Sequence, residues 1–208
     1  MAFHPHATAF SSKMANFDPF IRKKIRPMKK REINVADHAC EILKALKTGV
    51  LLTSCADGRV NTMTISWGML GIEWNYPLFI TVVREGRFTR SLLDKNGQFT
   101  INIPRADSPM KALAVCGTKS GRDIDKIAQL GLTLVDGEEV SVPAIKEFPL
   151  TLECQVVYKQ LQNLDALEDR TAYEKCYPQD ISGTSSGSNR DAHIAYYGKI
   201  LRAYMIEE

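Results

Sequence analysis

An Asp-Gly pair, Asp57 and Gly58, constrains the fold of this chain more than any other short feature. The pair lies between two runs of apolar and β-branched residues, and it tolerates the positive φ angles of a two-residue hairpin turn. The run from Val50 to Ala56 therefore predicts a strand, and the run from Arg59 to about Trp67 predicts its antiparallel partner.

The rest of the chain alternates between further strand-like and helix-like segments. Strands are predicted at Leu78–Arg84, Gln98–Ile103, Leu132–Val135, Leu150–Tyr158 and His193–Tyr204, with Gly198 marking a bulge or a close approach. Helices are predicted from Asn34 to Gly49 and at Phe88–Lys95, Pro109–Val115 and Asp123–Leu130, while the segment around Gly68 and Gly71 is expected to be a loop. This order predicts a mainly β protein with α decoration, built as a mainly antiparallel barrel.

The chain has 208 residues, enough for one sizeable core. Residues 1–31 are expected to form a loosely held basic arm, because seven Lys and Arg residues crowd positions 22–31 without interleaved aromatics. The domain then runs from 32 to 208 and carries a long polar insertion at about 160–190. The insertion ends in a Gly- and Ser-rich stretch, Ser182 to Ser188, that is expected to be flexible.

Charge and cysteine usage exclude several classes of protein. The net charge of +3 does not favour nucleic acid as a partner. No apolar run is long enough to span a bilayer, and the first 20 residues lack the pattern of a secretory signal. The five cysteines form no C-x-x-C pair, so neither a disulfide framework nor a zinc site is expected. All but Cys176 are expected to be core residues, and the cytoplasm is the expected compartment.

Nucleotide and hydrolase signatures are missing from the sequence. There is no G-x-G-x-x-G, no G-x-x-x-x-G-K-[ST], no H-E-x-x-H and no G-x-S-x-G. No metal ligands are assigned.

Four segments are candidates for binding or chemistry, and each has an ordinary structural explanation beside the functional one. The strand Asn61 to Trp67 carries hydroxyls and an amide that suit either a solvated sheet face or a polar heterocycle. Arg84, Arg87 and Thr89 stand where a strand ends and a helix begins, which suits a phosphate or a solvated pair of arginines.

The other two candidates lie further along the chain. The segment Lys119 to Lys126 either caps the next helix or covers an anionic ligand. His193 follows the insertion and is either structural or at the mouth of a pocket.

The order of these segments resembles the flavin reductase-like family, which has the FMN-binding split-barrel fold, and its flavoredoxin-like branch most closely. The likeness covers roughly residues 38–206 and rests on N-T-M-T-I-S-W (61–67), P-L-F-I-T-V-V-R (77–84), R-F-T (87–89), F-T-I-N-I-P (99–104), S-G-R-D-I-D-K (120–126), L-E-C (152–154), and His193 with Y-G-K-I (197–200).

The resemblance implies a role for each matching residue. Asn61, Thr62, Met63, Thr64, Ser66 and Trp67 would line the isoalloxazine and ribityl chain of FMN, and Val82, Val83 and Arg84 would continue that wall. Arg84, Arg87 and Thr89 would hold the phosphate, Lys126 would approach the flavin or its phosphate, and His193 would lie on the nicotinamide side.

The function that the resemblance implies is hydride transfer from NADH or NADPH to the flavin, in a homodimer with a small-molecule or protein electron acceptor. Two alternatives stay open: an FMN electron carrier without its own nicotinamide site, and a β-barrel interaction module that binds no flavin.

Overall fold

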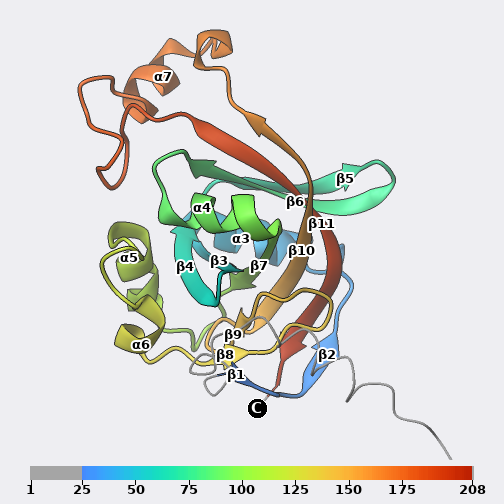
Figure 1. Ribbon diagram of the computed structural model, residues 1–208. Coiled ribbons are helices and arrows are strands. Elements are labelled where there is room, and N and C mark those ends of the chain that lie inside the picture. Colours follow the sequence, from blue (N-terminus) through green and yellow to red (C-terminus); the bar gives the residue numbers. More distant parts are fainter. Residues whose placement is uncertain (1–24, 208) are drawn as a thin grey trace, which may run out of the picture.

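A computed structural model describes residues 25–207, and it consists of one large curved sheet, a small second sheet and surrounding helices (Figure 1). The large sheet contains β2 (Lys30–Glu32), β3 (Val50–Ala56), β4 (Arg59–Ile65), β5 (Gly68–Glu73), β6 (Tyr76–Arg84), β7 (Gln98–Ile103), β10 (Leu150–Leu161) and β11 (His193–Ile206). The small sheet contains β1 (Ile25–Arg26), β8 (Leu134–Val135) and β9 (Ala144–Ile145).

The helices lie around the large sheet. They are α3 (Ala39–Thr48), α4 (Phe88–Asn96), α5 (Met110–Thr118), α6 (Lys126–Leu130) and α7 (Arg170–Cys176), with a short 3₁₀ turn, η1 (Leu164–Ala166). The prediction of a mainly β fold with α decoration is confirmed.

Strand order in the large sheet is β4-β3-β7-β10-β11-β6-β5, with β2 paired to β11, and every pairing in it is antiparallel. Because β4 stands at the end of this order, one of its edges has no partner strand in the described chain. Figure 1 shows α5 and α6 beside β4, and the segment that carries α7 projecting from the ends of β10 and β11. An unpaired strand edge leaves backbone N–H and C=O groups for other partners.

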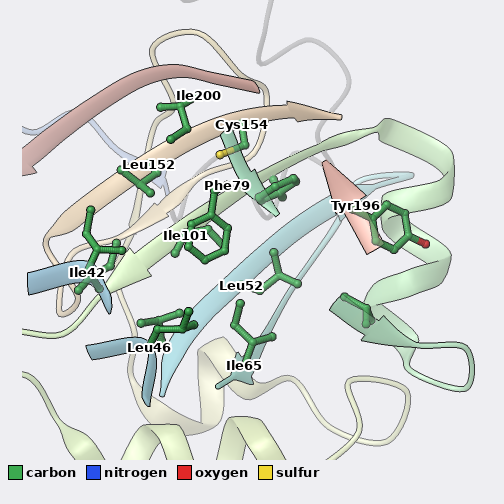
Figure 2. Close-up of a cluster of buried hydrophobic side chains, with 14 of the residues drawn as sticks. Ile42, Leu46, Leu52, Ile65, Phe79, Ile101, Leu152, Cys154, Tyr196 and Ile200 are labelled. Carbon is green, nitrogen blue, oxygen red and sulfur yellow. The ribbon is translucent and has the colours of Figure 1, made fainter. Parts of the chain in front are cut away.

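The main core packs against the large sheet and includes Ile42 and Leu46 of α3 (Figure 2). Leu52, Phe79, Ile101 and Leu152 come from four different strands and are almost fully buried. Gly198 makes the predicted close approach, since a Cβ there would lie 2.3 Å from Cζ of Phe99. The adjacent strand β10 has a register irregularity between Val156 and Tyr158.

The hairpin predicted at Asp57 and Gly58 is present, with φ values of 50° and 70° at the two turn residues. A second hairpin was not predicted: β5 and β6 are joined by Trp74 and Asn75, which also have positive φ values of 49° and 61°. The expected loop around Gly68 and Gly71 is therefore wrong, because these glycines lie in a strand paired along its length with β6.

The basic segment before the domain is only partly described, since Arg22, Lys23 and Lys24 lie outside the described residues. Its last part is not a loosely held arm. β1 pairs with β8, β2 pairs with β11, and the Ile25 side chain is buried in a second apolar cluster. Strand pairing therefore ties residues 25–31 to the domain.

Two smaller expectations also differ from the structure. Residues 35–38 form turns, so α3 begins only at Ala39, although Asn34 Oδ1 does accept the N–H of Ala36. Cys40 is exposed instead of buried because it lies on the outer face of that helix, and all five cysteines are free thiols.

Candidate functional site

Two adjoining cavities of about 270 and 490 Å³ lie between β4, α5, the start of α4 and the insertion. They share Met63, Arg87, Gly117, Thr118 and Ser186. Together they fall within the size range of small-molecule and cofactor sites, roughly 300–1,000 Å³.

Strand β4 and the residues after it supply one wall of both cavities. Asn61 and Met63 line the smaller cavity, and Met63, Thr64, Ser66 and Trp67 line the larger one. The Thr62 side chain does not line either cavity. It is fully buried, on the strand face opposite to Asn61 and Met63, and its hydroxyl contacts Thr53 Oγ1 at 3.1 Å.

The smaller cavity is strongly cationic. It is lined by Arg87, Lys119, Arg122 and Lys126, against a single carboxylate, that of Asp123. Lys126 is buried, and its ammonium donates to the carbonyls of Thr62 at 2.9 Å and Cys116 at 3.1 Å. Burial lowers the pKa of Lys126, and the nearby Arg87 lowers it further. A buried ammonium held only by carbonyls is well placed to receive an anion.

At one end of the smaller cavity, a hydrogen bond joins Asn61 to Thr89, and Gly121 packs closely against Asn61. Asn61 Nδ2 donates to Thr89 Oγ1 at 2.8 Å, which links β4 to the first turn of α4. Gly121 lies so close to Asn61 that a Cβ there would be 2.0 Å from Oδ1. The structure thus brings Asn61, Arg87, Thr89 and Lys126 together beside the start of a helix, where N–H groups point outward.

The larger cavity combines aromatic and polar side chains. It is lined by Trp67, Val82, Arg84 and His193, and the rings of Trp67 and His193 have centroids 5.0 Å apart. Burial lowers the pKa of His193 to about 3, and the positive charges of Arg84 and Arg87 lower it too. His193 is therefore neutral at physiological pH.

Arg84 does not share the smaller cavity with Arg87 and Thr89. Its guanidinium donates to the carbonyls of Asn189 at 3.2 Å, Asp191 at 2.7 Å and Cys176 at 2.7 Å. Arg87 contacts the insertion more weakly, at 3.4 Å from the carbonyls of Ser185 and Gly187. The expected pairing of Arg84 with Arg87 and Thr89 is corrected here, because the insertion folds back and takes the Arg84 donors.

Val83 does not line either cavity, because its side chain is in the main core. Val82 and Arg84, its neighbours along β6, point to the other face of the strand and line the larger cavity.

The insertion supplies site residues that the sequence did not reveal. Thr184 and Ser186 line the smaller cavity, and Ser186, Gly187 and Ser188 line the larger one. The Asp191 carboxylate accepts the N–H of Gly86 at 3.0 Å, where a Cβ on Gly86 would lie 2.6 Å from it. A polar loop without apolar periodicity gives no signal of where it docks.

Comparison with known proteins identifies the family. The flavin reductase like domain matches residues 43–208. The chain belongs to this family. YddH of Escherichia coli strain K12 is 35% identical to it over 165 residues, 78% of this chain and 79% of YddH. A protein of Archaeoglobus fulgidus is 32% identical over 117 residues, 56% of this chain, and the match spans only 64% of that protein.

Solved structures share the fold of this flavin reductase-like chain. Flavoredoxin of Desulfovibrio vulgaris (Miyazaki F) has a TM-score of 0.56 and 23% identity, covering 77% of this chain and 69% of flavoredoxin. A protein with a split barrel domain from Shewanella frigidimarina has a TM-score of 0.56 and 16% identity, covering 85% of this chain and 76% of that one. The predicted split-barrel fold is confirmed.

Two further features of the described residues bear on function. No helix among residues 25–207 has both the length and the apolar character needed to cross a membrane. The same residues contain no group of three or more His, Cys, Asp or Glu side chains that could hold a metal ion.

Proposed function

We propose that this protein binds FMN across the two cavities and transfers hydride from NADH or NADPH to the flavin. The observation that carries the proposal is the pairing of a cationic cavity, around Arg87 and Lys126, with a larger cavity walled by Trp67 and His193. FMN has an anionic phosphate tail and a polar ring system, so it requires a cationic cavity beside a larger one with an aromatic wall. Family membership and the likeness to flavoredoxin support the same ligand.

The phosphate fits the smaller cavity. Arg87 and Lys126 supply positive charge, Thr89 supplies a hydroxyl, and α4 begins at Phe88 with its free N–H groups. Charge-assisted hydrogen bonds of this kind are about twice as strong as neutral ones. In this proposal Arg87 replaces its two long contacts with the insertion by shorter ones to the phosphate.

The ring system fits the larger cavity. The unpaired edge of β4 offers backbone groups near Met63 and Thr64, and Trp67 offers an apolar face. When bound, the flavin would supply the hydride-accepting chemistry. The protein's own part is to orient the ring, to exclude water with the insertion, and to present His193 as an uncharged side chain where the nicotinamide would lie.

Two measurements on the purified protein test the proposal. An absorption spectrum after incubation with FMN and removal of free flavin is expected to show bound flavin, and NADH or NADPH oxidation is expected to require it. Bound flavin without nicotinamide oxidation would favour an electron carrier. A protein that stays colourless would favour an interaction module and contradict the proposal.

We also propose a homodimer and a reducing, cytoplasmic location. Ile72, Trp74 and Tyr158 are exposed by 75, 50 and 44%, and the rings of Trp74, Tyr158 and Tyr197 contact one another. An exposed aromatic cluster of this kind is typical of a protein interface. The five free thiols support a reducing compartment.

A further inference from the structure

Tyr177 is the residue of the insertion that contacts His193, a side chain of the larger cavity. It follows α7 and is buried, and its hydroxyl oxygen lies 2.9 Å from His193 Nδ1 and 3.2 Å from Gln162 Oε1. The rings of Tyr177 and His193 meet edge to face, with centroids 5.5 Å apart. Tyr177 therefore contacts His193 through both its ring and its hydroxyl.

The two contacts of the Tyr177 hydroxyl favour one tautomer of His193. The hydroxyl has one proton, and it donates that proton to Gln162 Oε1. With the Gln162 amide oxygen as its acceptor, the hydroxyl accepts in the contact with His193, which assigns the donor role there to Nδ1 of the neutral imidazole. The second ring nitrogen, Nε2, is left as an acceptor on a side chain that lines the larger cavity.

Arg84 holds Tyr177 in this position. Its guanidinium lies 5.1 Å from the centre of the Tyr177 ring and donates to the carbonyl of Cys176, the preceding residue. Two more donations, to Asn189 and Asp191, fix the far side of the insertion. The buried Arg84 guanidinium therefore stabilises the position in which Tyr177 contacts His193.

We propose that Tyr177 is a positioning residue that holds His193 in the tautomer protonated at Nδ1, so that Nε2 accepts a hydrogen bond from an N–H donor on the substrate. The tautomer is a property of the protein alone. The further statement, that Nε2 accepts a hydrogen bond from a donor such as the primary amide of a nicotinamide, rests on the proposed function. A tyrosine in an insertion thereby sets the hydrogen-bonding character of a side chain on the barrel.

The tautomer is tested by ¹⁵N NMR of the His193 ring in flavin-free protein at neutral pH. In the wild type we expect the chemical shift of a protonated nitrogen at Nδ1 and of an unprotonated nitrogen at Nε2. In Tyr177→Phe, which keeps the ring and loses the acceptor, we expect this pattern to be lost. In Tyr173→Phe, a half-buried tyrosine one turn earlier on α7, we expect it to be kept.

A wild-type His193 protonated at Nε2, or a Tyr177→Phe spectrum identical to wild type, would overturn the proposal. The wild-type measurement decides the tautomer even if the variant fails to fold.

The link to the reaction is tested separately in the FMN-loaded protein. Tyr177→Phe is expected to leave the Kd for FMN within about twofold and to slow flavin reduction by NADH or NADPH about tenfold, the effect of one lost hydrogen bond. An unchanged rate of flavin reduction in Tyr177→Phe would show that Tyr177 does not position His193 for the reaction. A wild type that binds no FMN would instead refute the proposed function and leave the tautomer result standing.

Discussion

Arg84 and Arg87 stand three residues apart, yet the structure gives them different tasks. Arg84 is buried and makes three hydrogen bonds to the insertion, two of them at 2.7 Å. Arg87 is half-buried and makes only contacts of 3.4 Å to the insertion. The sequence alone could suggest that both arginines bind an anion. It could not show that Arg84 instead holds the insertion, because the residues that Arg84 contacts lie about 100 positions away in the chain.

Replacing Arg87 by Ala is therefore expected to weaken FMN binding by at least about tenfold, since a charge-assisted phosphate contact is lost. The measurement is a fluorescence titration of FMN with the purified variant. Arg90→Ala is the matched control on the same helix, because Arg90 instead pairs with Asp94 at 2.8 Å. Equal affinities for wild type and Arg87→Ala would show that the phosphate is bound elsewhere.

The pKa of His193 predicts a specific pH dependence of stability. Its folded value of about 3 lies below the ordinary 6.5, so between these values the unfolded chain binds a proton that the folded protein does not. The free energy of unfolding should therefore fall as the pH drops below 6.5, by at most roughly 1.4 kcal/mol per pH unit from this group.

Urea unfolding of wild type and His193→Gln at pH 7, 6 and 5 measures this contribution. The wild type is expected to lose more stability than the variant over this range. Parallel curves would mean that His193 takes up a proton in the folded protein as easily as in the unfolded chain.

At the scale of elements, strands with clear apolar or β-branched runs could be predicted, and the first hairpin could be predicted from its turn residues. Asp57-Gly58 marked the first hairpin, and β3 and β7 have the predicted bounds. β5 was missed because Gly68 and Gly71 suggested a loop and because Trp74-Asn75 is an uncommon pair for positive φ. In the insertion only the stretch from Ser182 to Ser188 was expected to be flexible. The helix α7 was not predicted, and the insertion docks through contacts that only the folded chain brings together.

The docking of the insertion should depend on Arg84. Its side chain supplies three of the hydrogen bonds between the insertion and the sheet, so Arg84→Ala should favour local opening of residues 160–190. We expect a Glu-specific protease to cut at Glu168 or Glu174 at least about tenfold faster in this variant than in wild type.

Arg190→Ala is the control, since Arg190 is an exposed arginine of the same insertion. Cleavage of Arg84→Ala at the wild-type rate would show that other contacts hold the insertion.

For the whole molecule, the family, the split barrel and most cavity-lining residues on β4 and β6 followed from the resemblance to the flavin reductase-like family. The residues of the insertion that line the two cavities did not follow, because a polar loop gives no signal of where it docks. The cluster of Trp74, Tyr158 and Tyr197, in which Trp74 and Tyr158 are exposed and Tyr197 is half-buried, was also not predicted. Its members come from β10, β11 and the turn between β5 and β6.

This cluster is where we expect the second copy of the chain to bind. Trp74→Glu should shift the protein toward monomer in sedimentation velocity, because it places a charge in an apolar interface. Met110→Glu, which replaces an exposed apolar side chain on α5, should leave the distribution of species unchanged. A wild type that is monomeric at all concentrations would contradict the dimer.

A crystal structure of the protein with FMN tests the central claim most directly. The account predicts that phosphate oxygens lie within about 3.2 Å of the Arg87 guanidinium, beside Thr89 and Lys126, and that the ring system lies in the larger cavity next to Trp67 and His193. FMN bound away from these cavities, or with its phosphate out of reach of Arg87, would contradict it.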